Sequence, residues 1–310
     1  MKTFCPEGWL QNKKENKRLM LTPSTLTEAH INGEILESIA LMCDAEHNLV
    51  VNLGCMKGII PREEGAIGIG SGKTRDIALI SRVGKPVSFM VTDLKFDEDG
   101  NPYGVLSRRK AQLKCIEQYI SALSVGDVIN AKVTHLESFG AFCDIGCGII
   151  ALLPIDAISV SRIAHPKDRF LPGDDIRVII KSIADDGRIT LSCKELLGTW
   201  EENAAKFKTG QTVSGIVRSV EDYGIFVELT PNLAGLAESK AGVQVGQTAS
   251  VYIKSIIPEK MKIKLIVIDS FFDSSFPQPV QYTYEKEHID YWQYSPDSSP
   301  RRIISEFKCF

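Results

Sequence analysis

The stretch that decides the fold runs from Val125 to Ser192 and begins VGDVINAKVTHLESFGAFCDIG. Apolar residues alternate with polar ones through Ile129, Ala131 and Val133, which is the period of a half-buried strand. The stretch ends LPGDDIRVIIKSIADDGRITLS, in which two turn clusters bracket a run rich in Ile and Val. Short strands joined by tight turns over such a length predict a small closed barrel of five strands.

Several residues of this stretch recur in the order and spacing of a known family. Gly126-Asp127 is followed by SFGAFCDIG, by a short strand that ends at Pro154, by Gly173-Asp174, and by GRITLS with a Lys after it. This order resembles the S-one domain, the single-stranded-RNA-binding barrel that is repeated in the large S-one protein of the bacterial small ribosomal subunit. The resemblance implies an OB-fold barrel that binds RNA.

The same pattern occurs three times along the chain. The Phe139-Gly-Ala-Phe142 motif returns as Tyr223-Gly-Ile-Phe226, and residues 208–269 form a second copy. A weaker copy precedes both, beginning GEILESIALMCDAEHNLVVNLG and ending VLSRRK. The repeats predict an all-β protein of three tandem five-stranded OB-fold barrels of S-one type, joined by short helices.

We therefore expect five segments. They are an N-terminal arm (1–24), a degenerate S-one-like barrel (25–112), an S-one RNA-binding domain (122–196), an S-one-like RNA-binding domain (207–270) and an aromatic-rich C-terminal extension (271–310). The arm has a basic run and little periodicity, so we expect partial order at best. The extension is too rich in large apolar groups for disorder, and we expect it to pack on the third barrel. A second stacking surface is the alternative.

Two amphipathic stripes predict the joining helices. We expect both to pack against neighbouring barrels, with a partner surface as the alternative. The stripes, at three- and four-residue steps, are Leu113, Ile116, Ile120 and Leu123 in the first joint and Leu196, Trp200, Ala204 and Phe207 in the second.

The resemblance places an RNA-stacking platform at the rings of Phe139 and Phe142, because unstacked bases need flat side chains beneath them. Gly140 between the rings would let backbone and base approach closely. From the residues alone, one ring could instead belong to the core, since positions three apart do not share a strand face. The corresponding rings of the last copy are Tyr223 and Phe226.

The first copy has His47 and Val50 where the rings should be, so docking on the next barrel or on the ribosome is its predicted role. Alignment with the family also predicts cations that contact phosphate beside the ring pairs. These are Lys132, His135 and Arg188 in the middle copy and Arg218, Lys262 and Lys264 in the last. A solvated surface histidine is the alternative for His135. The Arg108-Arg109-Lys110 run could also contact phosphate, or could be a solvated helix start.

Composition limits the classes of function. The formal net charge is −3, so the chain lacks the basic footprint usual in nucleic-acid binders, and RNA affinity would have to come from local cations and stacking. The sequence has no apolar run of membrane-spanning length and no signal-peptide core, and we expect a cytoplasmic protein.

Two motifs that suggest other chemistry fail on spacing. Cys143 and Cys147 have no second pair or nearby His at ligand spacing, so we expect packed thiols that share a strand face and no metal. The stretch GAIGIGSGKT has Ile67 where a phosphate-binding loop needs its first glycine, and it interrupts a barrel copy. We therefore expect no nucleotide cofactor, and Lys73 should be solvated.

The sequence thus predicts a protein that binds single-stranded RNA without catalysis. The resemblance implies capture of messenger RNA at the small ribosomal subunit, with no cofactor and no membrane partner. Two alternatives stay open: an accessory role in RNA processing or decay, and a protein-docking scaffold. The sequence has neither a clustered set of Asp and Glu at metal-ligand positions nor a His pair, which argues against a nuclease.

Overall fold

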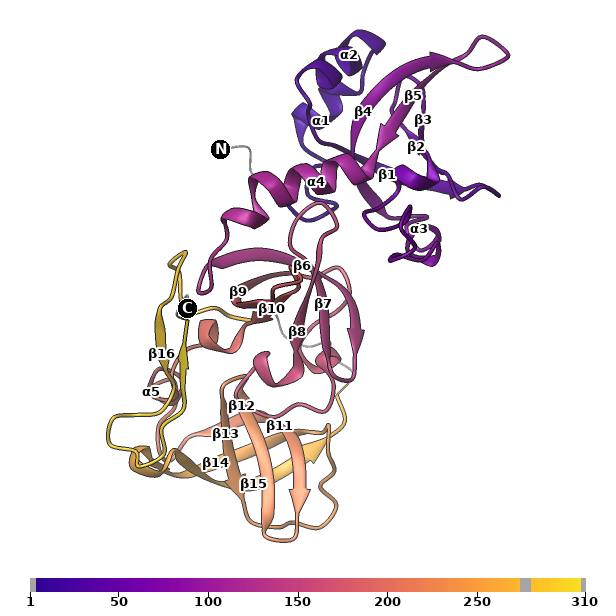
Figure 1. Ribbon diagram of the computed structural model, residues 1–310. Helices are drawn as coiled ribbons and strands as arrows, with labels where there is room; N and C mark the ends of the chain where they lie inside the picture. Colours follow the sequence, from indigo (N-terminus) through magenta and orange to yellow (C-terminus); the bar gives the residue numbers. More distant parts are fainter. Residues whose placement is uncertain (1–3, 274–279, 308–310) are drawn as a thin grey trace. The chain divides into compact units, whose positions relative to one another are not determined.

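Three closed barrels of five strands each follow one another along the chain in the computed structural model, which describes residues 4–273 and 280–307 (Figure 1). In each barrel the first three strands form a meander, and the fifth strand lies between the third and the fourth. The third and fifth strands pair in parallel, and each of these pairings closes a barrel. This arrangement confirms the predicted fold class, a series of OB-fold barrels.

The first barrel encloses a core of buried Leu, Val, Ile and Phe side chains. Helices α1 (Lys14–Leu19) and α2 (Pro23–Ile31) precede it and add Leu19 and Leu26 to the same core. Between β3 and β4 the chain makes a 3-10 turn and the four-residue helix α3 (Ile77–Ile80). The strands are β1 (Leu36–Cys43), β2 (Leu49–Asn52), β3 (Lys57–Ile60), β4 (Pro86–Phe96) and β5 (Pro102–Ser107).

The second barrel is the one that the opening stretch predicted. Its strands alternate buried and exposed residues, so that Ala131 and Val133 of β6 and Ala141 of β7 face the core. The strands are β6 (Val128–Glu137), β7 (Gly140–Asp144), β8 (Ile150–Pro154), β9 (Asp175–Ile183) and β10 (Ile189–Ser192).

The third barrel shares one core cluster with the C-terminal extension. Trp292, Tyr294 and Phe307 of the extension are buried with Val227 and Leu233 of the barrel, which confirms the predicted packing. Two short strands of the extension form a separate sheet. The strands are β11 (Thr212–Glu221), β12 (Gly224–Thr230), β13 (Leu233–Ala237), β14 (Thr248–Ile257) and β15 (Lys262–Phe271), followed by β16 (Tyr291–Gln293) and β17 (Ile304–Glu306).

The first joining helix packs through a face that the sequence pattern did not predict. In α4 (Arg108–Gln118) the buried residues are Arg108, Ala111, Gln112 and Cys115, whereas Leu113 and Ile116 of the predicted stripe are exposed. The predicted stripe is therefore wrong for Leu113 and Ile116, whereas Ile120, in the 3-10 turn after α4, is buried as predicted. Small residues such as Ala and Cys let a helix backbone approach its neighbour closely, and a count of large apolar residues misses such a face.

The second joint packs as predicted but is not one helix. Leu196, Trp200 and Ala204 are buried in the core cluster of the third barrel, with Phe207 partly buried against it. Gly198, at φ 85°, separates a 3-10 turn from the short helix α5 (Trp200–Ala204). This left-handed position suits glycine and ends the first turn.

The N-terminal arm is better ordered than its weak periodicity predicted. The buried carboxylate of Glu7 accepts hydrogen bonds from Arg108 at 2.7 and 3.0 Å and from the Ser88 amide at 3.0 Å. Burial opposes ionisation, but Arg108 and Ser88 hold the pKa of Glu7 below its ordinary value. Arg108 is therefore a buried structural cation, not a solvated helix start. Residues so far apart in the chain leave no local pattern from which this pairing could be predicted.

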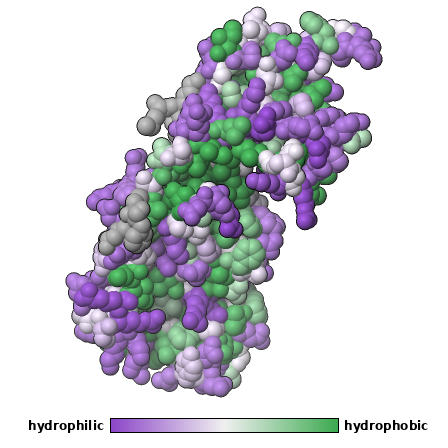
Figure 2. Space-filling model, in the orientation of Figure 1, coloured by the Kyte–Doolittle hydropathy of each residue, from purple (hydrophilic) through white to green (hydrophobic). Residues whose placement is uncertain are grey.

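By internal contacts the chain divides into two compact units. The first contains the described residues up to Leu123 together with 130–132 and 144–150, and the second contains the rest. The third barrel and the extension lie wholly in the second unit. Figure 2 shows that hydrophilic side chains cover much of the face in view, with hydrophobic groups among them. Within the described residues, the helices are too short and too polar to cross a bilayer.

Candidate nucleic-acid interface

The ring pair of the second barrel lies on the outer side of the barrel wall. Phe139 is in the turn before β7 and exposes 55% of its surface, and Phe142 is half-buried on β7. Because Ala141 and Cys143 face the core, Phe142 points outward. The two ring centroids are 5.9 Å apart with planes at 89°, so one ring meets the edge of the other. Neither ring is fully buried, and flat surface remains open to a ligand.

Gly140 sets this geometry. A Cβ at Gly140 would lie 2.6 Å from the Leu153 carbonyl oxygen of the neighbouring strand, a distance that a real side chain does not adopt. Only glycine permits this close approach of β7 and β8 between the two rings. In the Phe-Gly-x-Phe motif the glycine is therefore required for strand packing, and the two phenylalanines supply the rings.

The predicted cations of the second barrel lie in different surroundings. His135 stacks on Phe142 with ring centroids 6.4 Å apart and planes at 21°, and its Nε2 lies 2.7 Å from a Glu137 carboxylate oxygen. Lys132, which is half-buried on β6, extends toward the N-terminal arm, with its Cε 3.7 Å from the place of a Cβ on Gly8. The structure thus brings His135, but not Lys132, into contact with the ring pair.

Arg188 lies in the turn between β9 and β10, and its side chain is 85% exposed. Its Nε donates to Asp186 at 2.7 Å. Solvent screens an ion pair this exposed, so a phosphate can replace Asp186 at little cost. Arg188 is therefore available to an anionic ligand.

The third barrel repeats the ring geometry of the second. Tyr223 exposes 70% of its surface, and its ring centroid lies 6.1 Å from that of Phe226 with planes at 84°. A Cβ at Gly224 would meet the Ala237 carbonyl oxygen at 2.4 Å, so glycine is again required between the rings. The second and third barrels thus have the same perpendicular pair of aromatic rings, and in both a glycine between the rings lets neighbouring strands approach closely.

Strand register extends the Phe226 position into a row across the outer face of the third barrel. Directly paired residues form this third-barrel row, in the order Ser219, Phe226, Leu236, Lys264 and Ser255. Neighbouring strands lie about 4.8 Å apart, which puts Lys264 about 10 Å from Phe226. Lys262, two residues before Lys264, is exposed on the same face. The apolar side chain of Leu236 therefore lies between the ring of Phe226 and the two exposed lysines.

Arg218 has a different environment from the one that alignment with the family predicted. Only 12% of its side chain is exposed, and it pairs with Glu228 at 2.9 Å and with Asp168 at 3.4 Å. The sequence pattern gives the position of Arg218 on its strand, but it does not predict that Asp168 and Glu228 pair with it. Arg218 is already engaged, whereas Lys262 and Lys264 are not buried.

The first barrel has no ring in the equivalent place. Its row of directly paired residues, the first-barrel row, is Met42, Val50, Ile59, Val105 and Asp93. His47 lies in the turn before β2 with φ 64°, a left-handed conformation that is uncommon outside glycine. This row offers aliphatic groups and one carboxylate, so it has neither a stacking surface nor a cation.

The glycine-rich loop of the first barrel bonds to itself. The Thr74 amide donates to the Gly68 carbonyl oxygen at 3.1 Å, and the Thr74 hydroxyl donates to that of Ile67 at 2.7 Å. Lys73 is exposed, as expected. Donors that a phosphate-binding loop would present to its ligand are used inside the loop here.

Cys143 and Cys147 do not share a strand face, because β7 ends at Asp144 and Cys147 lies beyond it at φ 50°. That prediction is wrong, although both thiols are buried. The cysteines in the described part of the chain form no disulfide, and no group of three or more potential ligands there could hold a metal ion.

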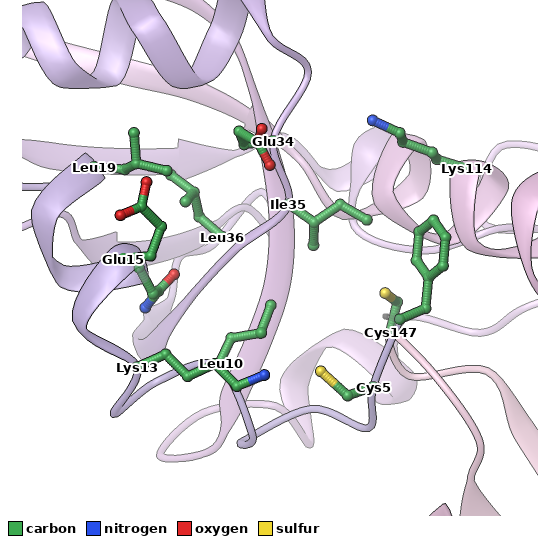
Figure 3. Close-up of a pocket in the computed structure, with 12 residues that line it drawn as sticks. Cys5, Leu10, Lys13, Glu15, Leu19, Glu34, Ile35, Leu36, Lys114 and Cys147 are labelled. Atoms are coloured by element: carbon green, nitrogen blue, oxygen red, sulfur yellow. The ribbon is translucent and has the colours of Figure 1, made fainter. Parts of the chain in front are cut away.

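Figure 3 shows a cavity of about 200 Å³ in the first unit, lined by residues of the arm and α1, by residues 34–36 at the start of β1, and by Lys114 and Cys147. Cys5 and Cys147 contribute their thiols to its wall. Burial raises the pKa of Cys5 to about 11, which keeps this thiol protonated at neutral pH. The cavity therefore lacks an activated nucleophile at Cys5, and neither ring pair contributes to its lining.

The fold and the two ring-bearing faces define a tandem OB-fold protein, a class in which such faces bind single-stranded nucleic acids. Residues 123–194 match the family model described as the S1 RNA binding domain, the S-one domain of the sequence analysis. The matched residues cover the second barrel, which carries the pair Phe139 and Phe142.

Curated relatives extend the likeness beyond the second barrel. The small ribosomal subunit protein bS1 homolog of Bacillus subtilis (strain 168) is 33% identical over 195 residues, 60% of this chain and 48% of the relative. The small ribosomal subunit protein bS1 of Staphylococcus aureus (strain COL) is 31% identical over 261 residues, 79% of this chain and 64% of the relative. The chain is thus similar to bS1 proteins, and it spans less than two thirds of the length of either relative.

Among solved structures, a multidomain protein with nucleic acid binding domains from Streptococcus pneumoniae is 15% identical. The match covers 78% of this chain and 75% of that chain, with a TM-score of 0.25.

Proposed function

We propose that this protein binds single-stranded RNA on the outer faces of its second and third barrels. The repeated ring pair is the observation that carries the proposal: Phe139 with Phe142, and Tyr223 with Phe226, each pair perpendicular and open to solvent. A stacking surface accepts every base because every base has a flat face, so such a site needs little sequence preference.

Basic side chains of the two barrels supply the phosphate contacts of this proposal. Arg188 and His135 serve the second barrel, and Lys262 and Lys264 serve the third. Lys132 and Arg218 take supporting parts, since one extends to the arm and the other is held by two carboxylates. With so few cations, binding relies on stacking more than on charge.

A double substitution tests the stacking site directly. Phe139→Ala with Phe142→Ala removes one ring pair, and we expect affinity for a short unstructured RNA to fall by about 1–3 kcal/mol for each base that loses its partner. Fluorescence anisotropy measures the affinity, and circular dichroism checks that the barrel stays folded. Wild-type affinity in a folded double variant would remove the second barrel from the proposal.

As the biological role we propose capture of messenger RNA at the small ribosomal subunit, without catalysis. Both relatives carry small ribosomal subunit protein bS1 in their names. Sedimentation of the tagged protein on a sucrose gradient separates this role from the alternatives. We expect the protein in the small-subunit fractions, released by ribonuclease or by excess single-stranded RNA. Sedimentation with a ribonuclease complex would instead support a role in RNA decay.

A further inference from the structure

A segment of the second barrel lies along the ring-bearing strand of the third barrel. This segment, residues 159–169, connects the 3-10 turn after β8 to β9 and will be called the bridging segment. At one end, the Val160 amide donates to the Asn232 side chain at 2.9 Å and the Ser161 amide donates to the Pro231 carbonyl oxygen at 3.1 Å. These contacts fix the segment at the turn that follows β12.

At its other end the bridging segment is held by buried charges. Arg169 pairs with Glu228 of β12 at 2.5 Å, and Asp168 pairs with Arg218 of β11 at 3.4 Å. Glu228 also accepts from Arg218, so two cations and two anions form a closed set. Both guanidinium groups, those of Arg218 and Arg169, are paired with carboxylates in this set, so neither is available to bind a phosphate.

Glu228 and Phe226 lie on the same face of β12. They are two residues apart, the Val227 side chain between them faces the core, and alternate residues of a strand are about 6.6 Å apart. Arg169 binds Glu228 and Ser161 binds Pro231 just after the strand, so the bridging segment contacts the C-terminal part of β12, starting two residues from Phe226.

Two cations of the bridging segment are exposed. Arg162 and Lys167 are both on the surface, and within residues 4–273 and 280–307 neither side chain has a hydrogen bond or an ion pair. Lys167 is two residues from Arg169, which limits their backbone separation to about 7 Å. Arg162 directly follows Ser161. Each cation is thus close to one end of the Phe226 strand, within reach of a strand of RNA on that face.

We propose that the RNA site of the third barrel is composite: Tyr223 and Phe226 stack the bases, and Arg162 and Lys167 of the second barrel contact the phosphates. This inference rests on the proposed function, because it needs RNA on the third-barrel face. It assigns to the bridging segment the phosphate contact that alignment with the family predicted for Arg218. The third barrel then depends on the second for part of its binding surface.

The test uses the full chain with Phe139→Ala and Phe142→Ala in place, so that binding reports the third barrel. In this background we compare Arg162→Ala with Lys167→Ala against the control Arg301→Ala with Arg302→Ala, which removes the same charge from exposed positions outside the barrels. The probe is a short oligouridylate, and the measurement is the slope of log affinity against log salt concentration.

Each lost phosphate contact on a single strand lowers the magnitude of that slope by about 0.7, so we expect a decrease of about 1.4 for the test pair. Between 50 and 200 mM salt this means a loss of affinity about sevenfold smaller than in the parent. The control pair should leave the slope unchanged. A Lys167→Arg variant should restore its part of the slope, which a purely structural role would not predict.

Two results would overturn the inference, and they are distinguishable. If Tyr223→Ala with Phe226→Ala still abolishes binding but the bridging pair behaves like the control pair, the third barrel binds RNA without these cations. If the ring variants leave affinity unchanged, RNA does not bind on this face, and the proposed function of the third barrel falls together with the inference. Melting temperatures identify any variant that fails to fold.

Discussion

The first and third barrels share a strand order but not the residues of the equivalent outer row. The third-barrel row contains Phe226 and Lys264, with Leu236 between them, whereas the first-barrel row contains Val50 and Val105 at the matching places. The core residues of both barrels are similarly aliphatic. The fold therefore depends on the inner positions, and the outer row is free to differ, which is where function can be gained or lost.

The largest effect should come from removing one ring in each binding barrel. Phe142→Ala with Phe226→Ala should lower RNA affinity by about 2–6 kcal/mol, that is 1–3 kcal/mol for each unstacked base. Isothermal titration with an unstructured RNA longer than one site measures the loss. Phe142→Tyr with Phe226→Tyr is the matched control, because tyrosine keeps the flat face, and it should bind nearly as the wild type does.

Arg218 and Lys264 should separate stability from binding within the third barrel. Arg218→Met removes two hydrogen bonds to Glu228 and an ion pair with Asp168, and it should lower the free energy of unfolding by about 2–3 kcal/mol. Chemical denaturation measures this loss. Lys264→Met, on an exposed position, should change stability by less than about 0.5 kcal/mol. Equal stability of the two variants would contradict the structural part given to Arg218.

Salt dependence should show which cations of the third-barrel face meet phosphate. Lys262→Ala with Lys264→Ala should lower the magnitude of the log-log salt slope by about 1.4, since each lysine neutralises one phosphate. Affinity at several salt concentrations gives the slope. If the slope is unchanged by this pair of substitutions, the phosphates do not contact the lysines of β15.

The smallest effect belongs to the first barrel. Met42→Ala with Ile59→Ala removes two apolar side chains of the first-barrel row, and RNA affinity should stay within about 0.5 kcal/mol of the wild type. The same anisotropy assay applies. A loss as large as that of the third-barrel ring variants would mean that this barrel also binds RNA, and the contrast between the barrels would disappear.

The sequence predicted the parts of this molecule that repeat locally. Strand alternation around Val133, the Phe-Gly-x-Phe motif and its Tyr223 copy identify the barrels and the rings, because both signals lie within a few residues of each other. Gly140 was predicted to let a base approach the backbone, which stays a prediction; the structure gives a different reason for the glycine, since a Cβ there would lie 2.6 Å from the Leu153 carbonyl oxygen.

Contacts between residues distant in the chain could not be predicted in this way. Glu7 with Arg108, and Arg169 with Glu228, join positions that share no period or motif. Alignment therefore assigned Arg218 to phosphate although the fold engages it elsewhere. The face of α4 was missed for another reason: it packs through Ala111 and Cys115, and a search for large apolar residues passes over small ones.

The central claim is that bases stack on the ring pairs of the second and third barrels, and crosslinking tests it most directly. A short RNA that carries photoreactive 4-thiouridine, irradiated with the full chain, should crosslink to peptides containing Phe139 and Phe142 and to peptides containing Tyr223 and Phe226. Mass spectrometry locates the crosslinks, and Phe142→Ala should remove the first set only. Crosslinks confined to the first barrel, or unchanged by Phe142→Ala, would contradict the account.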